Sequence, residues 1–175
     1  MSKSRWSLKS GISMGFHMEP VYLWKYKLHS NVSSGIYLSA GYEYFITPKL
    51  AIGTHPTFYQ YYNAVTINDI KVKGFQYTVE LPLFVRYRFY NKWSAYLGSS
   101  IKNYRDFEDQ SLEKSSNIRV DLLLGGTYRI HEKFAIDFNY SAMVSKKIES
   151  LIVKRSPHHV NVGIIYFIGQ KSKNI

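Results

Sequence analysis

Nine charged residues share one setting in the sequence, because each directly follows an apolar or aromatic residue. They are Lys9, Glu43, Glu80, Arg86, Arg88, Lys102, Arg119, Asp121 and Asp137. In an extended strand successive side chains point to opposite faces, so these charges would lie on one face and the apolar residues on the other. Ions on an enclosed face must be paired, because a lone buried charge is costly. We therefore expect a salt-bridged network inside the fold, with a small selective pore as the alternative.

Histidines and serines, which can bind metals or carry out catalysis, are present, but their spacing does not match a known metal-binding or catalytic motif. No histidine stands four positions from another with a glutamate between, as in zinc proteases. Adjacent His158 and His159 would point to opposite faces of a strand and could not hold one metal ion. There is no cysteine, and no nucleophile elbow or triad order accompanies the serines. The sequence predicts no enzyme, metal or cofactor.

Basic and aromatic residues gather in two segments that we expect to be loops, 19–33 and 146–157. These candidate contact residues are Tyr22, Trp24, Lys25, Tyr26, Lys27, Lys146, Lys147, Lys154 and Arg155. The formal net charge is +11, but the basic surplus is spread over loops, interior and tail instead of forming the single stripe that marks a nucleic-acid site. We therefore expect contacts with lipopolysaccharide headgroups or an envelope protein partner, and no nucleic acid.

Alternation at period two runs through almost the whole chain and predicts eight strands. They cover residues 6–16, 35–44, 50–58, 75–89, 93–102, 117–125, 134–141 and 160–166. Tight turns are expected at 47–49, 90–92 and 130–133, and longer segments at 19–33, 63–73, 105–115 and 146–157. Short and long connections alternate, which is typical of an up-and-down barrel. We expect one all-β domain over residues 1–175, an eight-stranded antiparallel barrel.

Alternation alone would also suit a soluble lipocalin-like carrier, in which the apolar face lines a cavity. Three features favour a transmembrane barrel. Nine strand glycines share the polar face and only Gly126 departs from it, which suits a narrow interior. Aromatic residues lie near strand ends on the apolar face, and no charge lies on that face within the strands. We expect a Gram-negative outer-membrane protein with periplasmic termini, and an export signal that once preceded Met1.

Residues 79–89 combine an acidic residue, an apolar–Pro–apolar step, a basic residue and an aromatic one, in the order VELPLFVRYRF. They resemble a middle strand of the PorT-like outer-membrane barrel family of Bacteroidetes. Residues 96–98, 125–128 and 162–167 are also similar to that family, whereas the tail 169–175 continues past its usual aromatic end. The resemblance implies an eight-stranded barrel and a link to type IX protein secretion. We expect a non-enzymatic anchor or accessory subunit of an envelope complex, whose loops engage a partner or surface glycan.

Overall fold

The structure, a computed structural model, describes residues 3–16, 21–23, 26–28, 33–67, 70–106, 117–144 and 158–168. The described backbone is extended and forms these strands: β1 (Ser4–Phe16), β2 (Val21–Leu23), β3 (Tyr26–Leu28), β4 (Ser33–Phe45), β5 (Leu50–Thr54), β6 (Thr57–Ile67), β7 (Ile70–Arg88), β8 (Trp93–Asp106), β9 (Asn117–Arg129), β10 (Phe134–Met143) and β11 (His158–Ile168). Strands β2 and β3 pair with each other as a small hairpin. No helix of this part of the chain is long and apolar enough to cross a membrane.

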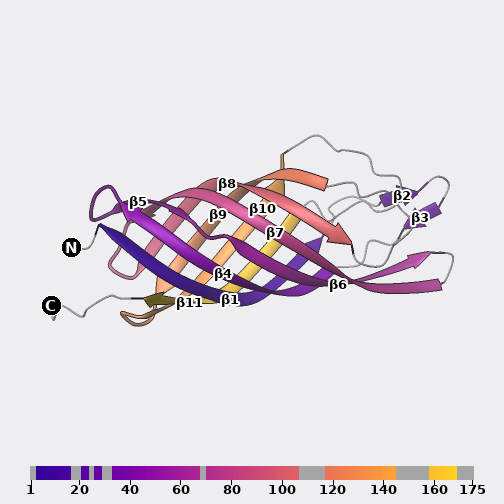
Figure 1. Cartoon of the computed structure of the whole chain (residues 1–175), viewed down its shortest axis with the longest axis horizontal. Helices are drawn as coiled ribbons and strands as arrows, with labels where there is room; N and C mark the ends of the chain where they lie inside the picture. Colours follow the sequence, from indigo (N-terminus) through magenta and orange to yellow (C-terminus); the bar gives the residue numbers. More distant parts are fainter. Residues whose placement is uncertain are drawn as a thin grey trace.

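The other nine strands close into a barrel of eight antiparallel strands, which confirms the predicted fold class (Figure 1). Strands β5 and β6 count as one barrel strand, because both lie between β4 and β7. They are divided at His55 and Pro56, and a proline has no N–H to donate to a ladder. Pairing of β1 with both β4 and β11 closes the ring. Closure leaves no open sheet edge, as hydrocarbon surroundings require.

The two ends of the barrel differ in their connections. Strand β1 begins and strand β11 ends at the end of the barrel that carries the short turns 46–49, 89–92 and 130–133, which we call the turn end (Figure 1). All three turns are closed by backbone hydrogen bonds: the amides of Ile46 and Thr47 donate to the carbonyl of Leu50, that of Tyr90 donates to the carbonyl of Trp93, and that of Ile130 donates to the carbonyl of Phe134. The opposite end, toward which β2 and β3 lie, is the loop end.

One predicted connection was wrong, because residues 63–73 do not form a long loop. Strand β6 continues to Ile67 and β7 begins at Ile70, and their backbones pair from Asn63 with Gly74 to Ile67 with Ile70. Several residues there are β-branched, including Val65, Thr66 and Val72, and such residues favour strands. The alternation of polar and apolar residues fades in this stretch, so the periodicity alone did not reveal the hairpin.

The apolar faces of the barrel strands point outward. Leu81 and Leu83 are 54% and 62% exposed, whereas Glu80 and Arg86 on the opposite face are 3% and 5% exposed. The same arrangement holds around the ring, with Leu8, Leu38, Leu97, Leu122 and Ile164 all among the exposed side chains. A lipocalin-like carrier needs the reverse arrangement, so this alternative is wrong. An outer surface of this kind matches lipid tails.

Outward-facing aromatic rings gather near the strand ends, as predicted for a girdle at headgroup level. Paired rings mark the turn end at Trp6 and Tyr42, Trp93 and Tyr128, and Phe134 and Tyr166, with centroids 4.7, 4.6 and 5.3 Å apart. Tyr62 and Phe75 form such a pair farther toward the loop end, with centroids 5.7 Å apart. These rings bound the apolar belt on both sides.

A charge in the middle of this belt should destabilise the barrel far more than one at its border. Leu81 lies six residues from both Phe75 and Tyr87 on β7, so it marks the centre of the belt. We expect Leu81→Arg to cost about 2–4 kcal/mol of folding free energy and Tyr87→Arg about 0–1 kcal/mol. Reversible denaturant unfolding in phospholipid vesicles measures both values. Equal costs at the two positions would contradict the membrane-facing assignment.

Candidate functional site

The barrel interior brings together most of the charged residues singled out in the sequence. Lys9, Glu43, Glu80, Arg86, Lys102, Arg119, Asp121 and Asp137 are all buried there. Arg88 is only half-buried and lies at the turn end. Arg5 joins the buried set, so that five buried cations face four buried carboxylates among the described residues. The interior is therefore close to neutral.

The half of the interior nearer the loop end is organised around Lys102 and Asp121. The ammonium of Lys102 lies 3.0 Å from the Asp121 carboxylate and 3.5 Å from that of Glu80, and it donates to Ser141 Oγ at 2.9 Å. Arg119 donates to both carboxylate oxygens of Asp121, at 2.5 and 2.6 Å. This fork geometry is the strongest form of carboxylate pairing. The contacts connect strands β7, β8, β9 and β10 across the lumen.

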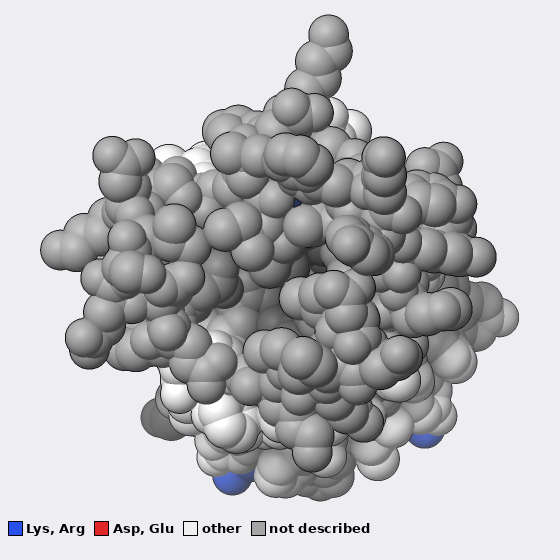
Figure 2. Space-filling view, turned by 90° about the vertical axis from the view of Figure 1, so that its right-hand side faces the viewer, with Lys and Arg blue, Asp and Glu red and all other residues white. Residues whose placement is uncertain are grey.

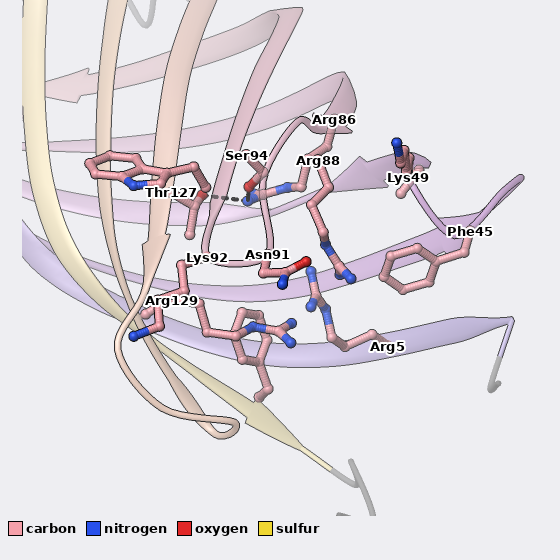
Figure 3. Close-up of a pocket in the computed structure, with 14 residues that line it drawn as sticks. Arg5, Phe45, Lys49, Arg86, Arg88, Asn91, Lys92, Ser94, Thr127 and Arg129 are labelled. Carbon is pink, nitrogen blue, oxygen red and sulfur yellow. Dashed lines mark hydrogen bonds between the residues drawn. The ribbon is translucent and has the colours of Figure 1, made fainter. Parts of the chain in front are cut away.

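A second charge cluster surrounds Glu43 nearer the turn end. Arg86 Nε lies 3.0 Å from Glu43 Oε1, Arg5 pairs with the other carboxylate oxygen, and His55 Nε2 is 3.6 Å from Oε1. Arg86 also donates to Ser94 and Thr127, which hold its guanidinium group in place (Figure 3). Sequence reasoning missed Arg5 and His55. Both lie on the inward parity, so extending the alternation in β1 by two positions would have found Arg5.

Asp137 is a third interior carboxylate, and several donors surround it. Lys9 Nζ lies 2.5 Å from its Oδ2, and the Tyr96 hydroxyl donates to it at 3.0 Å. Thr127 Oγ1 donates to Oδ1 at 3.1 Å, and Asn139 Nδ2 donates to Oδ2 at 3.2 Å. These partners offset the cost of burying the carboxylate away from water.

Tyrosine rings fill much of the remaining interior. Tyr59 stacks on Tyr61 with ring centroids 5.4 Å apart, and Tyr37 contacts Tyr59 at the same distance. The Tyr37 hydroxyl lies against Gly11 and Gly163, where an added Cβ would come closer than 3 Å to it. Glycine is therefore needed on both neighbouring strands. The predicted third strand ended at residue 58, so the sequence did not place Tyr59 or Tyr61 inside.

Hydrogen bonds tie these rings to the ion pairs. The Tyr59 hydroxyl donates to Glu80 at 2.5 Å. The Tyr61 hydroxyl lies 3.0 Å from Ser13 Oγ and 3.2 Å from His159 Nδ1. Among the described residues, no three His, Asp or Glu side chains form a group suited to a metal ion. The arrangement is chemically a cross-linked plug of paired ions and rings.

The candidate contact residues of the loops lie largely outside the described residues. Trp24, Lys25, Lys146, Lys147, Lys154 and Arg155 are all outside them. The backbone of Tyr22 belongs to β2 and that of Tyr26 and Lys27 to β3. In Figure 2, which looks onto the loop end, the described residues that can be seen are almost all uncharged.

A closed antiparallel barrel of eight strands with an apolar exterior and paired interior charges has the fold of small outer-membrane β-barrels. The structure is similar to the outer membrane protein OprG from Pseudomonas aeruginosa, with a TM-score of 0.57 and 13% identity over 95% of this chain and 96% of that one. It is also similar to Ail, the attachment invasion locus protein of Yersinia pestis, with a TM-score of 0.55 and 17% identity over 95% and 99% of the two chains. No protein-family model and no curated protein matches the sequence.

Removing the shared cation of the loop-end cluster should strongly destabilise the barrel. Lys102→Met leaves Glu80 without its cation and removes one of the two cations that contact Asp121. Breaking a buried pair from one side costs about 3–5 kcal/mol. The matched control is Lys133→Met, at an exposed turn position, for which we expect a change within about 0.5 kcal/mol. Denaturant unfolding of both variants in detergent micelles measures the difference, and equal stabilities would show that these contacts are unimportant.

Proposed function

We propose that this protein is a non-enzymatic outer-membrane barrel that serves as an anchor or accessory subunit of an envelope complex. The observation that carries the proposal is the combination of an apolar outer belt with an interior filled by ion pairs and tyrosines. The belt holds the chain in lipid, and the filled interior leaves little space for cargo or substrate. What remains available for recognition is the two ends.

The long connections at the loop end face outward from the cell in this proposal, and the termini face the periplasm. Outer-membrane barrels place short turns on the periplasmic side and longer loops outside. The basic and aromatic residues of segments 19–33 and 146–157 then meet lipopolysaccharide, a surface glycan or a protein partner. Ail, which shares the fold, has been crystallised with the heparin analogue sucrose octasulfate. This supports a polyanionic ligand for the outer loops.

The resemblance of residues 79–89 to PorT-like barrels supports a finer version of the same proposal. In that version the envelope complex belongs to type IX protein secretion in Bacteroidetes, and the barrel serves as one of its membrane subunits. Co-purification from native membranes with an affinity tag tests this directly. Recovery of secretion components supports the link, and recovery of the barrel alone would contradict it.

A small selective pore is the competing function, and the filled interior argues against it. Ion pairs and rings span the lumen at several levels, from Glu43 through Asp137 to Asp121. We expect the purified barrel to produce no conductance steps in planar lipid bilayers, because paired ions and aromatic rings occupy the lumen at these levels. A porin added to the same bilayer serves as the positive control. Reproducible single-channel steps from the barrel would favour the pore.

Loss of basic charge from the last long loop should weaken binding to lipopolysaccharide. Each basic residue near an anionic surface contributes about 1 kcal/mol, so Lys146→Gln with Lys147→Gln should reduce the affinity roughly tenfold or more. The matched control is Lys3→Gln with Lys133→Gln, two exposed lysines at the turn end. Titration of phosphatidylcholine nanodiscs with lipopolysaccharide measures both variants. An equal loss of affinity in the control variant would show that only the net charge matters, and it would contradict a binding site in the loop.

A further inference from the structure

The turn end of the barrel contains a cavity whose charge the interior network does not balance. The space inside it that the centre of a water molecule can reach is about 20 Å³, and the cavity is partly open to solvent. Six basic side chains line it: Arg5, Lys49, Arg86, Arg88, Lys92 and Arg129. No Asp or Glu occurs among its described lining residues. The nearest carboxylate contacts come from Glu43, which is shared between Arg5 and Arg86.

Three guanidinium groups converge in this cavity. Arg5, Arg88 and Arg129 extend from strands β1, β7 and β9 and point toward one another around Asn91 (Figure 3). Arg5 and Arg129 both lie on the ring of Phe167, with their guanidinium carbons 4.1 and 5.2 Å from its centroid. Such cation–π contacts fix the orientation of the groups. Like charges are therefore held close together before any ligand arrives.

The donors of these groups are not fully used within the described part of the chain. Arg5 is 95% buried, since only 5% of its surface is exposed, and its Nε and Nη1 have no hydrogen-bond partner there. No carboxylate of the described residues forms an ion pair with Arg88 or Arg129. Buried donors without acceptors are costly, and so is the repulsion between converging cations. A bound anion would remove both costs.

We propose that this cavity binds a phosphate-class anion carrying two or more negative charges. Arginine presents its donors in a planar fork that matches phosphate oxygens, and several arginines around one site favour a multivalent oxyanion. The cavity is too small for a folded partner, and it is open to solvent on one side. In the orientation proposed above it opens to the periplasm, where free phosphate compounds and anionic lipid headgroups both supply this chemistry.

The test uses the full chain in zwitterionic detergent micelles and titrates it with inorganic pyrophosphate by calorimetry at constant ionic strength. We expect saturable binding to one site per chain. Arg88→Gln and Arg129→Gln should each weaken it at least tenfold, because they remove donors that face the anion. Neither side chain forms an ion pair with a carboxylate of the described residues, so the variants should keep the heat-modifiable gel migration of the folded barrel.

The matched control is Lys133→Gln, which changes the net charge equally at the same end but does not line the cavity. It should bind pyrophosphate as the native chain does. An equal loss in Lys133→Gln, or unchanged binding by Arg88→Gln and Arg129→Gln, would overturn the proposal in favour of diffuse charge attraction. Absence of pyrophosphate binding combined with binding of a polyglutamate peptide would overturn it as well, because the ligand would then be a carboxylate-rich segment.

A second titration distinguishes the two sources of phosphate, which are free phosphate compounds and anionic lipid headgroups. The titration is repeated in nanodiscs of phosphatidylcholine with and without phosphatidylglycerol. If anionic headgroups occupy the cavity, phosphatidylglycerol should weaken the apparent pyrophosphate affinity of the native chain. Unchanged affinity would assign the site to free phosphate compounds, and both results support the proposed chemistry. None of these readouts involves the outer loops, so failure here leaves the proposed anchor function untouched.

Discussion

The structure depends on one constraint, which is that backbone polar groups in hydrocarbon must find their hydrogen bonds within the protein. A sheet satisfies this requirement only when it closes, and here the pairing of β1 with β11 and β4 completes the ring. Closure with eight strands leaves a narrow interior. The apolar exterior, the glycines under Tyr37 and the paired interior ions all follow from a small closed sheet in lipid.

The narrow interior explains why charge and aromatic rings occur together there. A charge that cannot reach water needs an opposite charge and hydrogen-bond donors, and Asp137 obtains them from Lys9, Tyr96, Thr127 and Asn139. Lys9, Tyr96 and Thr127 come from strands other than that of Asp137, whereas Asn139 shares its strand β10. A shift of one strand by one residue would turn the inward side chains of that strand outward and separate the pairs that it forms with other strands. The ion pairs therefore favour one register of the barrel over its neighbours.

The two ends of the barrel are chemically different, and in the function proposed above recognition takes place at these ends. The aromatic pairs near Trp6, Trp93 and Phe134 hold the turn end at the lipid border, while the guanidinium groups of Arg5, Arg88 and Arg129 face inward at its mouth. The same end thus carries an apolar collar outside and a cationic cavity inside. Neighbouring residues of β7 contribute to both the collar and the cavity, since Tyr87 faces lipid and Arg88 faces the cavity.

The sequence by itself determined the eight barrel strands, which face of each strand points outward and the class of fold, because period-two alternation follows directly from strand geometry. It missed the β6–β7 hairpin and the inward positions of Tyr59 and Tyr61, since the alternation weakens around Pro56 and beyond residue 62. Only the tertiary structure decided which charges meet. Arg5 pairs with Glu43 and converges with Arg129 because the register and the closure of the barrel bring distant strand ends together. The local alternation of residues predicts neither the register nor the closure.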